Sequence, residues 1–294
     1  MRMRSLLFVP GDSERKFVKA RDCGADVLFL DLEDSVSPGK KDAARIAVTD
    51  WLKSVDAIAP SLFVRINPLD TSMAADDLAA VVQPGLAGIL LPKSNGGQDL
   101  ARLGEMIDSL EAAAAMPRYS VQIMVVATET PRAMFDLGSY VPPHPRLAAL
   151  TWGAEDLAAA IGATDNKEPD GSWTFPYQLA RTQSLFAAAA AEVAPIDTLY
   201  ANFRDIEGLA ADCRTARRDG FVGRIAIHPD QVPTINAAFL PSLEDVEHAQ
   251  RVVAAFADAP DAGTVGIDGR MFDIPHLKAA RNTLAAAGQV ELMP

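Results

Sequence analysis

The chain has 294 residues, of which 49% are hydrophobic and 22% are charged, which is the composition of an ordinary globular protein. A mainly disordered chain is excluded, because the apolar residues can bury enough surface to offset the entropy lost on folding. The chain carries 39 acidic and 27 basic residues, giving a formal net charge of −12. A field of this sign repels nucleic acid and anionic membranes, so neither is expected as a partner.

The N-terminal segment and the cysteines bear on the cellular compartment. Pro10 stops the apolar run Leu6–Val9 short of the roughly 7–15 residues of a signal peptide. No run approaches the ~18 apolar residues of a membrane span. Cys23 and Cys213 lie far apart, which indicates scattered thiols in a reducing compartment. We therefore expect a soluble, cytoplasmic protein.

Short apolar runs alternate with helix-like segments along the first 240 residues. The expected strands, each with a helical segment after it, are Ser5–Val9, Val27–Asp31, Leu62–Ile66, Gly88–Leu91, Val121–Val126, Leu147–Trp152, Ile196–Tyr200 and Arg224–Ile227. This alternation is typical of parallel strands covered by helices, and about eight βα units form a TIM barrel. The sequence therefore predicts an α/β protein with a TIM (β/α)8 barrel, and a doubly wound open sheet is the competing fold.

Local signals predict particular helices and loops. Asp12 and Ser13 are expected to cap a helix over Glu14–Arg21, and Pro131 is expected in the first turn of the helix after the fifth strand. The polar, turn-rich stretch Gly162–Pro176 is long for a βα connection. It predicts a lid or rim loop, or alternatively a surface insertion without function.

The chain continues beyond the eighth unit. Pro241–Pro294 adds a helix-like segment, a turn at Gly263–Arg270 and a helix near Pro275–Ala287. A barrel does not need this segment. We therefore expect residues 1–240 to form the catalytic barrel and residues 241–294 to form a C-terminal helical extension that packs at a subunit interface.

Acidic side chains follow the fifth and sixth expected strands. Glu129 comes shortly after Val121–Val126, and Asp156 comes shortly after Leu147–Trp152. The carboxyl ends of barrel strands form the active-site mouth, so both carboxylates are expected there. Mg²⁺ prefers oxygen ligands and commonly takes one or two protein carboxylates, so this pair is a candidate Mg²⁺ site. Helix capping is the alternative role.

Charged residues also follow the second and third strands. Asp31, Glu33 and Asp34 crowd the end of the second strand, where they either order metal-bound waters or cap the next segment. Arg65 ends the third strand, where an unpaired buried charge would be costly. Its guanidinium suits the carboxylate of a keto or hydroxy acid, and a buried ion pair with one of the three carboxylates is the alternative.

The loop after the first strand opens a basic helix. Backbone N–H groups at the helix start, together with Arg15, Lys16 and Lys19, could meet a phosphate. The loop does not match a GxxxxGK[ST] P-loop, and no GxGxxG follows a strand. These absences argue against a nucleotide kinase and a dinucleotide oxidoreductase.

Seven segments occur in one order between about Arg4 and Arg281: SLLFVPGDSERKFVKA, FLDLEDSVSPGKKDAAR, VRINP, ATETPRAM, LTWGAEDLAAAIG, GRIAIHPDQVPTIN and GRMFDIPHLKAAR. Together they resemble the citrate lyase β-subunit-like CoA ester lyases of the HpcH/HpaI aldolase superfamily. Because the match covers most of the chain, it is more specific than any one motif. It favours the barrel over the doubly wound sheet.

The resemblance implies a Mg²⁺-dependent lyase that makes or breaks a carbon–carbon bond in a short 3-hydroxyacyl-CoA thioester, such as malyl-, citramalyl- or citryl-CoA. Cleavage gives a keto acid and an acyl-CoA. Glu129 and Asp156 match the family's metal ligands, and Arg65 matches the arginine that binds the keto acid. Glu33 and Asp34 match an acidic pair near the metal's waters and complete the substrate-binding set with Arg65 and Glu129.

The resemblance also implies roles for more distant residues. Asp273 matches a C-terminal aspartate that reaches a neighbouring subunit's site in several relatives, so a homotrimer or homohexamer is implied. A carboxylate with a raised pKa could deprotonate the thioester methyl group, whereas a helix cap before Pro275 is the alternative role of Asp273. Arg15 and Lys19 lie in a matching loop and are candidates for binding the CoA phosphates.

Two departures from the relatives leave the thioester contacts open. Ile274 stands where a basic residue is frequent, and Ser94 and Asn95 follow Lys93 where Val-Glu is frequent. The alternative functions are a citrate lyase β-subunit acting on a carrier-protein thioester, a thioester-binding paralogue without turnover, and an aldolase of free keto acids.

Overall fold

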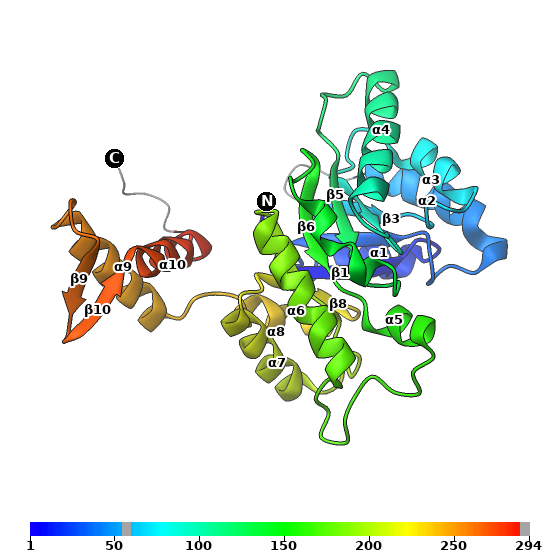
Figure 1. The fold of residues 1–294 in the computed structure, drawn as a ribbon. Helices are drawn as coiled ribbons and strands as arrows, with labels where there is room; N and C mark the ends of the chain where they lie inside the picture. Colours follow the sequence, from blue (N-terminus) through cyan, green and yellow to red (C-terminus); the bar gives the residue numbers. More distant parts are fainter. Residues whose placement is uncertain (55–59, 289–294) are drawn as a thin grey trace. The chain divides into compact units, whose positions relative to one another are not determined.

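The computed structural model describes residues 1–54 and 60–288, and its first compact unit, Met1–Asn236, contains a closed barrel of eight parallel strands (Figure 1). The strands pair in chain order, and the first closes the barrel against the eighth through partners such as Leu6 and Ile225. The predicted TIM barrel is confirmed, and the doubly wound sheet is wrong. The strands are β1 (Ser5–Pro10), β2 (Val27–Asp31), β3 (Ser61–Arg65), β4 (Gly88–Leu91), β5 (Gln122–Val126), β6 (Leu147–Thr151), β7 (Ala194–Asp197) and β8 (Gly223–Ala226).

Strand β7 departs most from its predicted bounds. It begins at Ala194, before Pro195, and it ends at Asp197. Proline cannot donate a ladder hydrogen bond, but the carbonyl of Pro195 accepts one from Val222 N–H, so the strand includes it. The Asp197 carboxylate accepts a hydrogen bond from Thr198 N–H at 2.9 Å and so replaces a ladder bond at the strand end.

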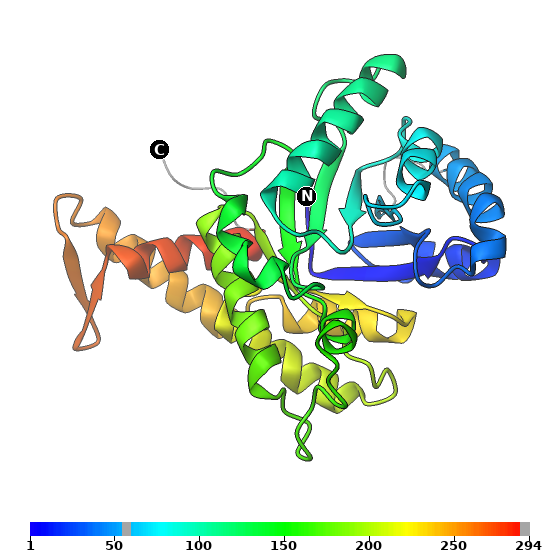
Figure 2. The same cartoon turned by 45° about the vertical axis from the view of Figure 1, so that its right-hand side comes forward.

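Helices surround the barrel strands in both views of the unit (Figures 1 and 2). Those of the first unit are α1 (Glu14–Arg21), α2 (Lys41–Lys53), α3 (Met73–Val81), α4 (Gly97–Ala113), α5 (Ala154–Ile161), α6 (Phe175–Ala190), α7 (Ile206–Asp219) and α8 (Val232–Ala238), with short 3₁₀ turns η1 (Pro38–Lys40) and η4 (Pro229–Gln231). The predicted bounds of α1 are confirmed. Ser13 occupies its N-cap position, but the side chain makes no capping hydrogen bond.

The prediction of a helix after every strand is wrong after β5. Only the 3₁₀ turns η2 (Ala133–Phe135) and η3 (Leu137–Tyr140) follow it, and Pro131 lies in a turn that precedes η2. The segment is short, and Pro142, Pro143 and Pro145 close it. Proline lacks the N–H that would continue a helix, so a longer α-helix cannot form here.

The barrel interior is apolar below its mouth. Its buried side chains are Leu6, Val27, Phe29, Phe63, Leu90, Met124, Val126, Ala149, Ile196 and Ile225. Phe29 and Phe63 meet edge to face with their ring centroids 6.2 Å apart. Because alternate residues of a strand point to the same side, Asp31 and Arg65, two residues further on, also point inward. The apolar layer therefore ends in charged side chains at the carboxyl ends of β2 and β3.

The predicted rim loop at Gly162–Pro176 leads into α6. The Trp173 ring meets Trp152 edge to face at 5.1 Å and lies 6.1 Å from Tyr177. Lys167 Nζ lies 3.1 Å from the centroid of the Trp173 ring. These contacts fix the loop on the barrel wall, and its role as a lid stays a prediction.

The second compact unit, Ala237–Pro294, is a helical hairpin with two short strands. It contains α9 (Leu243–Ala257), β9 (Thr264–Ile267), β10 (Arg270–Asp273) and α10 (Ile274–Ala286). The predicted turn at Gly263–Arg270 lies within the antiparallel β9–β10 hairpin. Residues 289–294 of the predicted extension lie outside the described residues. The predicted boundary at residue 240 and the interface role stay predictions.

The core of the second unit is small. Five buried residues form it, namely Ala249, Val252, Phe256, Leu277 and Ala280. Ser242 caps α9 by accepting a hydrogen bond from Asp245 N–H at 3.1 Å. Across residues 1–54 and 60–288, no helix combines the length and the apolar character needed to cross a membrane.

Candidate active site

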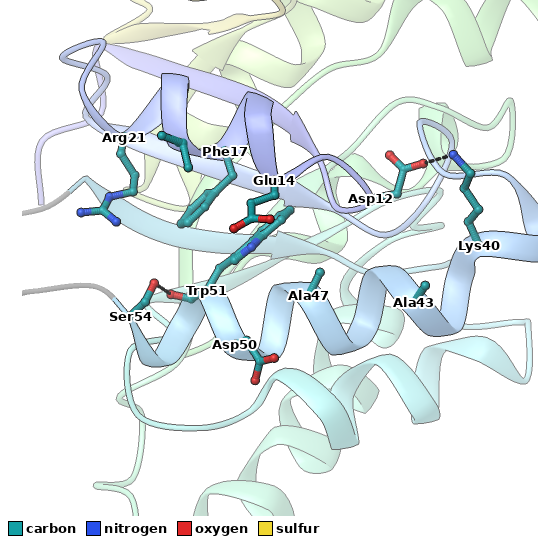
Figure 3. Close-up of a pocket in the computed structure, with 11 residues that line it drawn as sticks. Asp12, Glu14, Phe17, Arg21, Lys40, Ala43, Ala47, Asp50, Trp51 and Ser54 are labelled. Atoms are coloured by element: carbon teal, nitrogen blue, oxygen red, sulfur yellow. Dashed lines mark hydrogen bonds and ion pairs between the residues drawn. The ribbon is translucent and has the colours of Figure 1, made fainter.

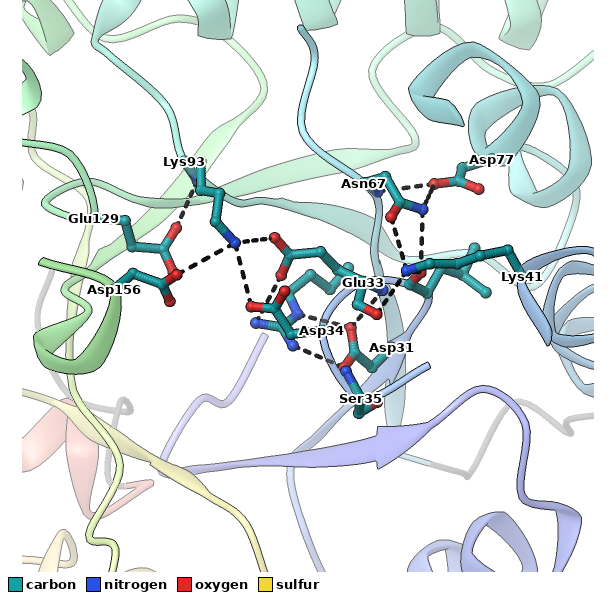
Figure 4. A network of polar contacts seen from close by, with 12 residues as sticks. Asp31, Glu33, Asp34, Ser35, Lys41, Asn67, Asp77, Lys93, Glu129 and Asp156 are labelled. Atoms are coloured by element: carbon teal, nitrogen blue, oxygen red, sulfur yellow. Dashed lines mark hydrogen bonds and ion pairs between the residues drawn. The ribbon is translucent and has the colours of Figure 1, made fainter. Parts of the chain in front are cut away.

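Charged side chains from five consecutive strand ends meet at the mouth of the barrel (Figure 4). Asp31 ends β2 and Arg65 ends β3, whereas Lys93, Glu129 and Asp156 follow β4, β5 and β6. Parallel strands deliver their carboxyl ends to one edge, so residues far apart in sequence become neighbours. The structure thus brings together the predicted residues Arg65, Glu33, Asp34, Glu129 and Asp156, which ion pairs and hydrogen bonds link directly or through Lys93.

Arg65 is anchored by Asp31. Its Nε and Nη2 donate hydrogen bonds of 2.7 Å to the two Asp31 oxygens, and Nη1 lies 3.0 Å from Glu33 Oε2. Burial alone raises the pKa of Asp31, but the hydrogen bonds and charge of Arg65 outweigh it and hold that pKa below its ordinary value. The ion-pair interpretation of Arg65 is confirmed.

Arg65 also keeps a face toward a cavity at the barrel mouth. A guanidinium has five N–H donors, and Asp31 takes two of them, so donors remain for a substrate carboxylate. The Phe8 ring lies 4.6 Å from the guanidinium carbon and packs against it. Arg65 is therefore a fixed cation that can serve a ligand without leaving its ion pair.

The segment after β2 is fixed by its own hydrogen bonds. Asp31 accepts bonds from Glu33 N–H at 2.9 Å and Ser35 N–H at 3.1 Å, so it caps this turn as one alternative predicted. Lys41 Nζ donates to the carbonyls of Leu32 at 2.6 Å and Glu33 at 2.7 Å. The turn therefore holds Glu33 and Asp34 in place beside the mouth.

Lys93 is a central residue that the sequence reasoning did not assign to the site. Its Nζ pairs with Glu33, with Asp34 at 3.2 Å and with Asp156 at 3.4 Å, and its backbone N–H donates to Glu129 Oε2 at 2.5 Å. Burial lowers the pKa of Lys93, but the hydrogen bond and the charge of Glu33 outweigh it and raise the pKa above its ordinary range. The sequence does place this lysine just after a buried strand, which is a position that could have indicated a residue of the barrel mouth.

Glu129 and Asp156 lie side by side although they follow different strands (Figure 4). Glu129 is 5% exposed, and burial raises its pKa to about 8, with the charges of Asp156 and Glu33 adding to the effect. A Cβ at Gly153 would lie 2.7 Å from Glu129 Cγ, so this glycine lets α5 begin beside Glu129. Gly153 is the N-cap of α5, so Asp156 does not cap that helix.

The donor set at the mouth fits Mg²⁺. Across the described part of the chain, no three His, Cys, Asp or Glu side chains form a ready-made metal cluster. Mg²⁺ needs no such cluster, because waters and substrate oxygens usually complete its octahedron around one or two carboxylates. The cations of Arg65, Lys93 and Lys41 lie beside the five carboxylates of Asp31, Glu33, Asp34, Glu129 and Asp156, so acidic groups outnumber these cations at the mouth.

A cavity of about 790 Å³ extends from the mouth along β1. Asp34 and Arg65 line one part of it, and Arg15, Lys16 and Lys19 of α1 line another. Among the described residues, none of these three cationic side chains has an ion-pair or hydrogen-bond partner. The remaining wall is mainly apolar and includes Leu7, Phe8, Val9, Pro10, Leu199, Ile227 and Pro229.

A second hollow of about 720 Å³ lies between α1 and α2 (Figure 3). The Phe17 and Trp51 rings stack there with their centroids 4.5 Å apart, and Lys40 Nζ lies 3.0 Å from Asp12. The hollow contains none of the predicted site residues. Acidic and basic side chains both line it, so it gives no charge preference for one class of ligand.

Asp273 belongs to the second compact unit, where it ends β10 and is the N-cap of α10. It caps α10 by accepting a hydrogen bond from His276 N–H at 3.4 Å, as the alternative interpretation predicted. The hydrogen bond from His276 lowers the pKa of Asp273. The pKa of Asp273 is therefore shifted in the direction opposite to the raised pKa expected of a catalytic base.

Known proteins resemble the chain over nearly its whole length. Residues 4–229 match the family described as HpcH/HpaI aldolase/citrate lyase. A (3S)-malyl-CoA thioesterase of Cereibacter sphaeroides is 34% identical over 286 residues, covering 97% of this chain and 94% of that protein. The mitochondrial citramalyl-CoA lyase of Homo sapiens is 30% identical, with 98% and 86% covered. CitE of Mycobacterium tuberculosis, solved with magnesium, acetoacetate and coenzyme A, superimposes with a TM-score of 0.78, 32% identity and 98% of each chain covered.

Proposed function

The chain belongs to the HpcH/HpaI aldolase/citrate lyase family of enzymes, and we propose that it is a Mg²⁺-dependent lyase of a short 3-hydroxyacyl-CoA thioester. Malyl-, citramalyl- and citryl-CoA are the substrates of the right class. Cleavage breaks the bond between the hydroxyl-bearing carbon and the thioester's α-carbon. It releases a keto acid and an acyl-CoA.

One observation carries the proposal: a single cavity is lined both by Asp34 and Arg65 of the charged mouth and by three basic side chains of α1 that have no partner among the described residues. Arg65 and Asp34 line this cavity, and Arg15, Lys16 and Lys19 of α1 line it as well. Most of the remaining lining residues are apolar. A CoA thioester matches these features, because its reactive thioester is joined through a long arm to several phosphates. The thioester would lie at the charged mouth, and the phosphates would lie near the basic side chains. Charge-assisted bonds from arginine and lysine suit those phosphates.

Each residue at the mouth then has a task in the cleavage. Glu129 and Asp156 would hold Mg²⁺. When bound, the metal offsets negative charge that develops on the keto-acid oxygens. Arg65 binds the carboxylate of the keto-acid half with the donors that Asp31 does not use. Glu33 and Asp34 orient the water molecules around the metal.

Asp273 is the proposed base for the thioester carbon in the synthetic direction. It would abstract a proton from the methyl group of the acyl-CoA, and the resulting carbanion would attack the keto carbon. The keto oxygen would then take a proton from solvent and become the hydroxyl group of the product. We propose that the second unit of a neighbouring protomer supplies this side chain within a homotrimer or homohexamer. Burial at that subunit contact would remove solvent from Asp273 and raise its pKa.

A coupled assay tests the proposal. Purified protein with Mg²⁺ is given malyl-, citramalyl- and citryl-CoA in turn, and keto-acid release and free-thiol release are measured separately. Wild-type protein should release a keto acid from at least one ester, whereas Asp156→Ala should not. Glu155→Ala is the matched control, because it removes an exposed carboxylate from the same helical turn. No keto acid from any ester would refute the lyase.

Thioester hydrolysis is a second candidate, because the Cereibacter sphaeroides relative is named a (3S)-malyl-CoA thioesterase. Hydrolysis would release free CoA thiol and malate from malyl-CoA without glyoxylate. The two readouts of the coupled assay separate these reactions. If no free CoA ester reacts but the same acyl group reacts on a carrier protein, the citrate lyase β-subunit alternative gains support.

A further inference from the structure

Lys93 contacts every carboxylate on the metal side of the mouth (Figure 4). Its Nζ pairs with Glu33, Asp34 and Asp156, and its backbone N–H donates to Glu129. Both candidate metal ligands are therefore also partners of Lys93. A metal ion bound by Glu129 and Asp156 must share Asp156 with the ammonium of Lys93 and Glu129 with the backbone N–H of the same residue.

The backbone around Lys93 fixes this arrangement. Lys93 has a φ of +50°, in the left-handed region that residues other than glycine seldom occupy. The next residues are tied down, since Asn95 N–H donates to Asp99 at 2.8 Å and Asn95 Oδ1 accepts from Thr130 Oγ1 at 2.8 Å. The side chain is therefore anchored over the mouth by its loop as well as by its ion pairs.

We propose that Lys93 is an internal cation that competes with Mg²⁺ for the carboxylate of Asp156 and so lowers the metal affinity of the site. This inference rests on the proposed function, which supplies the metal. Glu33 and Asp34 pair with the same ammonium, so Lys93 keeps two partners when Asp156 binds the metal. A single and a double charge a few ångströms apart repel enough to weaken binding on the order of tenfold even in a water-like dielectric.

Calorimetric titration of metal-free protein with MgCl₂ tests the inference. Lys93→Met keeps the backbone bond to Glu129 but removes the ammonium, so its Kd for Mg²⁺ should fall about tenfold or more. Lys93→Arg keeps the charge and should bind Mg²⁺ with nearly the wild-type Kd. Lys40→Met is the control for net charge, because Lys40 is exposed and pairs with Asp12 outside the site. It should also leave the Kd nearly unchanged.

The outcomes separate this inference from the proposed function. Measurable wild-type binding with an unchanged or larger Kd in Lys93→Met would overturn the inference alone and would make Lys93 only an organiser of the carboxylates. Absence of Mg²⁺ binding in both proteins would overturn the metal part of the proposed function and the inference together. Lys93→Gln provides a second neutral variant if Lys93→Met does not fold, as judged by circular dichroism.

Discussion

Replacing Arg65 with methionine should lower the free energy of unfolding by about 3–5 kcal/mol at pH 7, because it leaves the buried Asp31 carboxylate without its cation and removes one of the two cations beside Glu33. The side chains of Arg65, Asp31 and Glu33 are 13%, 1% and 3% exposed. Two hydrogen bonds of 2.7 Å join Arg65 to Asp31, and an ion pair of 3.0 Å joins it to Glu33. Methionine is a flexible side chain that fills much of the same space, so most of the loss is electrostatic.

The loss should also depend on pH, with a sign that follows from Asp31. In the wild type the folded pKa of Asp31 lies below its unfolded value of about 3.9, so the pair stabilises the protein above that pH and loses this effect as the pH falls through the folded pKa. In Arg65→Met burial acts without the cation and raises the folded pKa of Asp31 above about 3.9. Proton uptake then relieves the buried charge, so the difference from wild type should shrink from pH 7 toward pH 4.

Urea unfolding followed by circular dichroism between pH 7 and pH 4 measures this difference. Arg45→Met is the matched control, because Arg45 is also 13% exposed and donates to the fully buried Asp77 at 2.6 Å outside the mouth. Both variants should lose stability, but only Arg65→Met should raise the KM for the keto acid. The reasoning is refuted if Arg65→Met costs less than about 1 kcal/mol, the range of an exposed pair, or if its cost grows on acidification.

Three further changes test separate parts of the molecule. Glu129→Gln should abolish Mg²⁺-dependent turnover in the coupled assay with an unchanged circular dichroism spectrum, and retained turnover would contradict its role as a metal ligand. The double variant Arg15→Met, Lys19→Met should raise the KM for CoA thioesters about tenfold or more with kcat retained, because it removes charge-assisted phosphate contacts; an unchanged KM would place the phosphates elsewhere. Arg146→Met should cost about 3–5 kcal/mol in urea unfolding, because it leaves the Glu111 carboxylate buried without its cation, and the turnover of the folded fraction should not change.

Most of the barrel could be predicted from the sequence, because each buried parallel strand leaves a continuous apolar run. The run from Val27 to Asp31 is fully buried in the structure and has the predicted bounds. The segment after β5 was harder, because Pro131 is compatible with the first turn of a helix and equally with a turn that precedes a 3₁₀ helix. The order of the strands cannot decide between an α-helix and 3₁₀ turns after β5, because either connection allows the barrel to close.

The candidate site was only partly predictable. Glu129 and Asp156 could be placed at the mouth because strand ends converge there whatever the side chains do. The sequence could not decide the partners of Arg65, because a buried guanidinium can be stabilised by carboxylates of the protein or by a ligand. The structure shows that Asp31 accepts two hydrogen bonds from Arg65, so N–H donors remain for a ligand. Lys93 was missed because its position depends on a left-handed backbone and on carboxylates from three other strands.

The residues of the cavity and the mouth form two groups, and substitutions in the two groups should change different kinetic constants. Arg15 and Lys19 lie on α1 at the first strand, whereas Glu129 and Asp156 follow β5 and β6 on a different arc of the barrel. The first group touches only the part of CoA that does not react, so its loss weakens substrate and transition state alike and raises KM. The second group would hold the ion that meets charge only as the carbon–carbon bond breaks, so its loss lowers kcat. Arg65 belongs to neither group, because it is proposed to bind the carboxylate of the keto-acid half, so it contacts both the bound substrate and the reacting part, and its variants should change both KM and kcat.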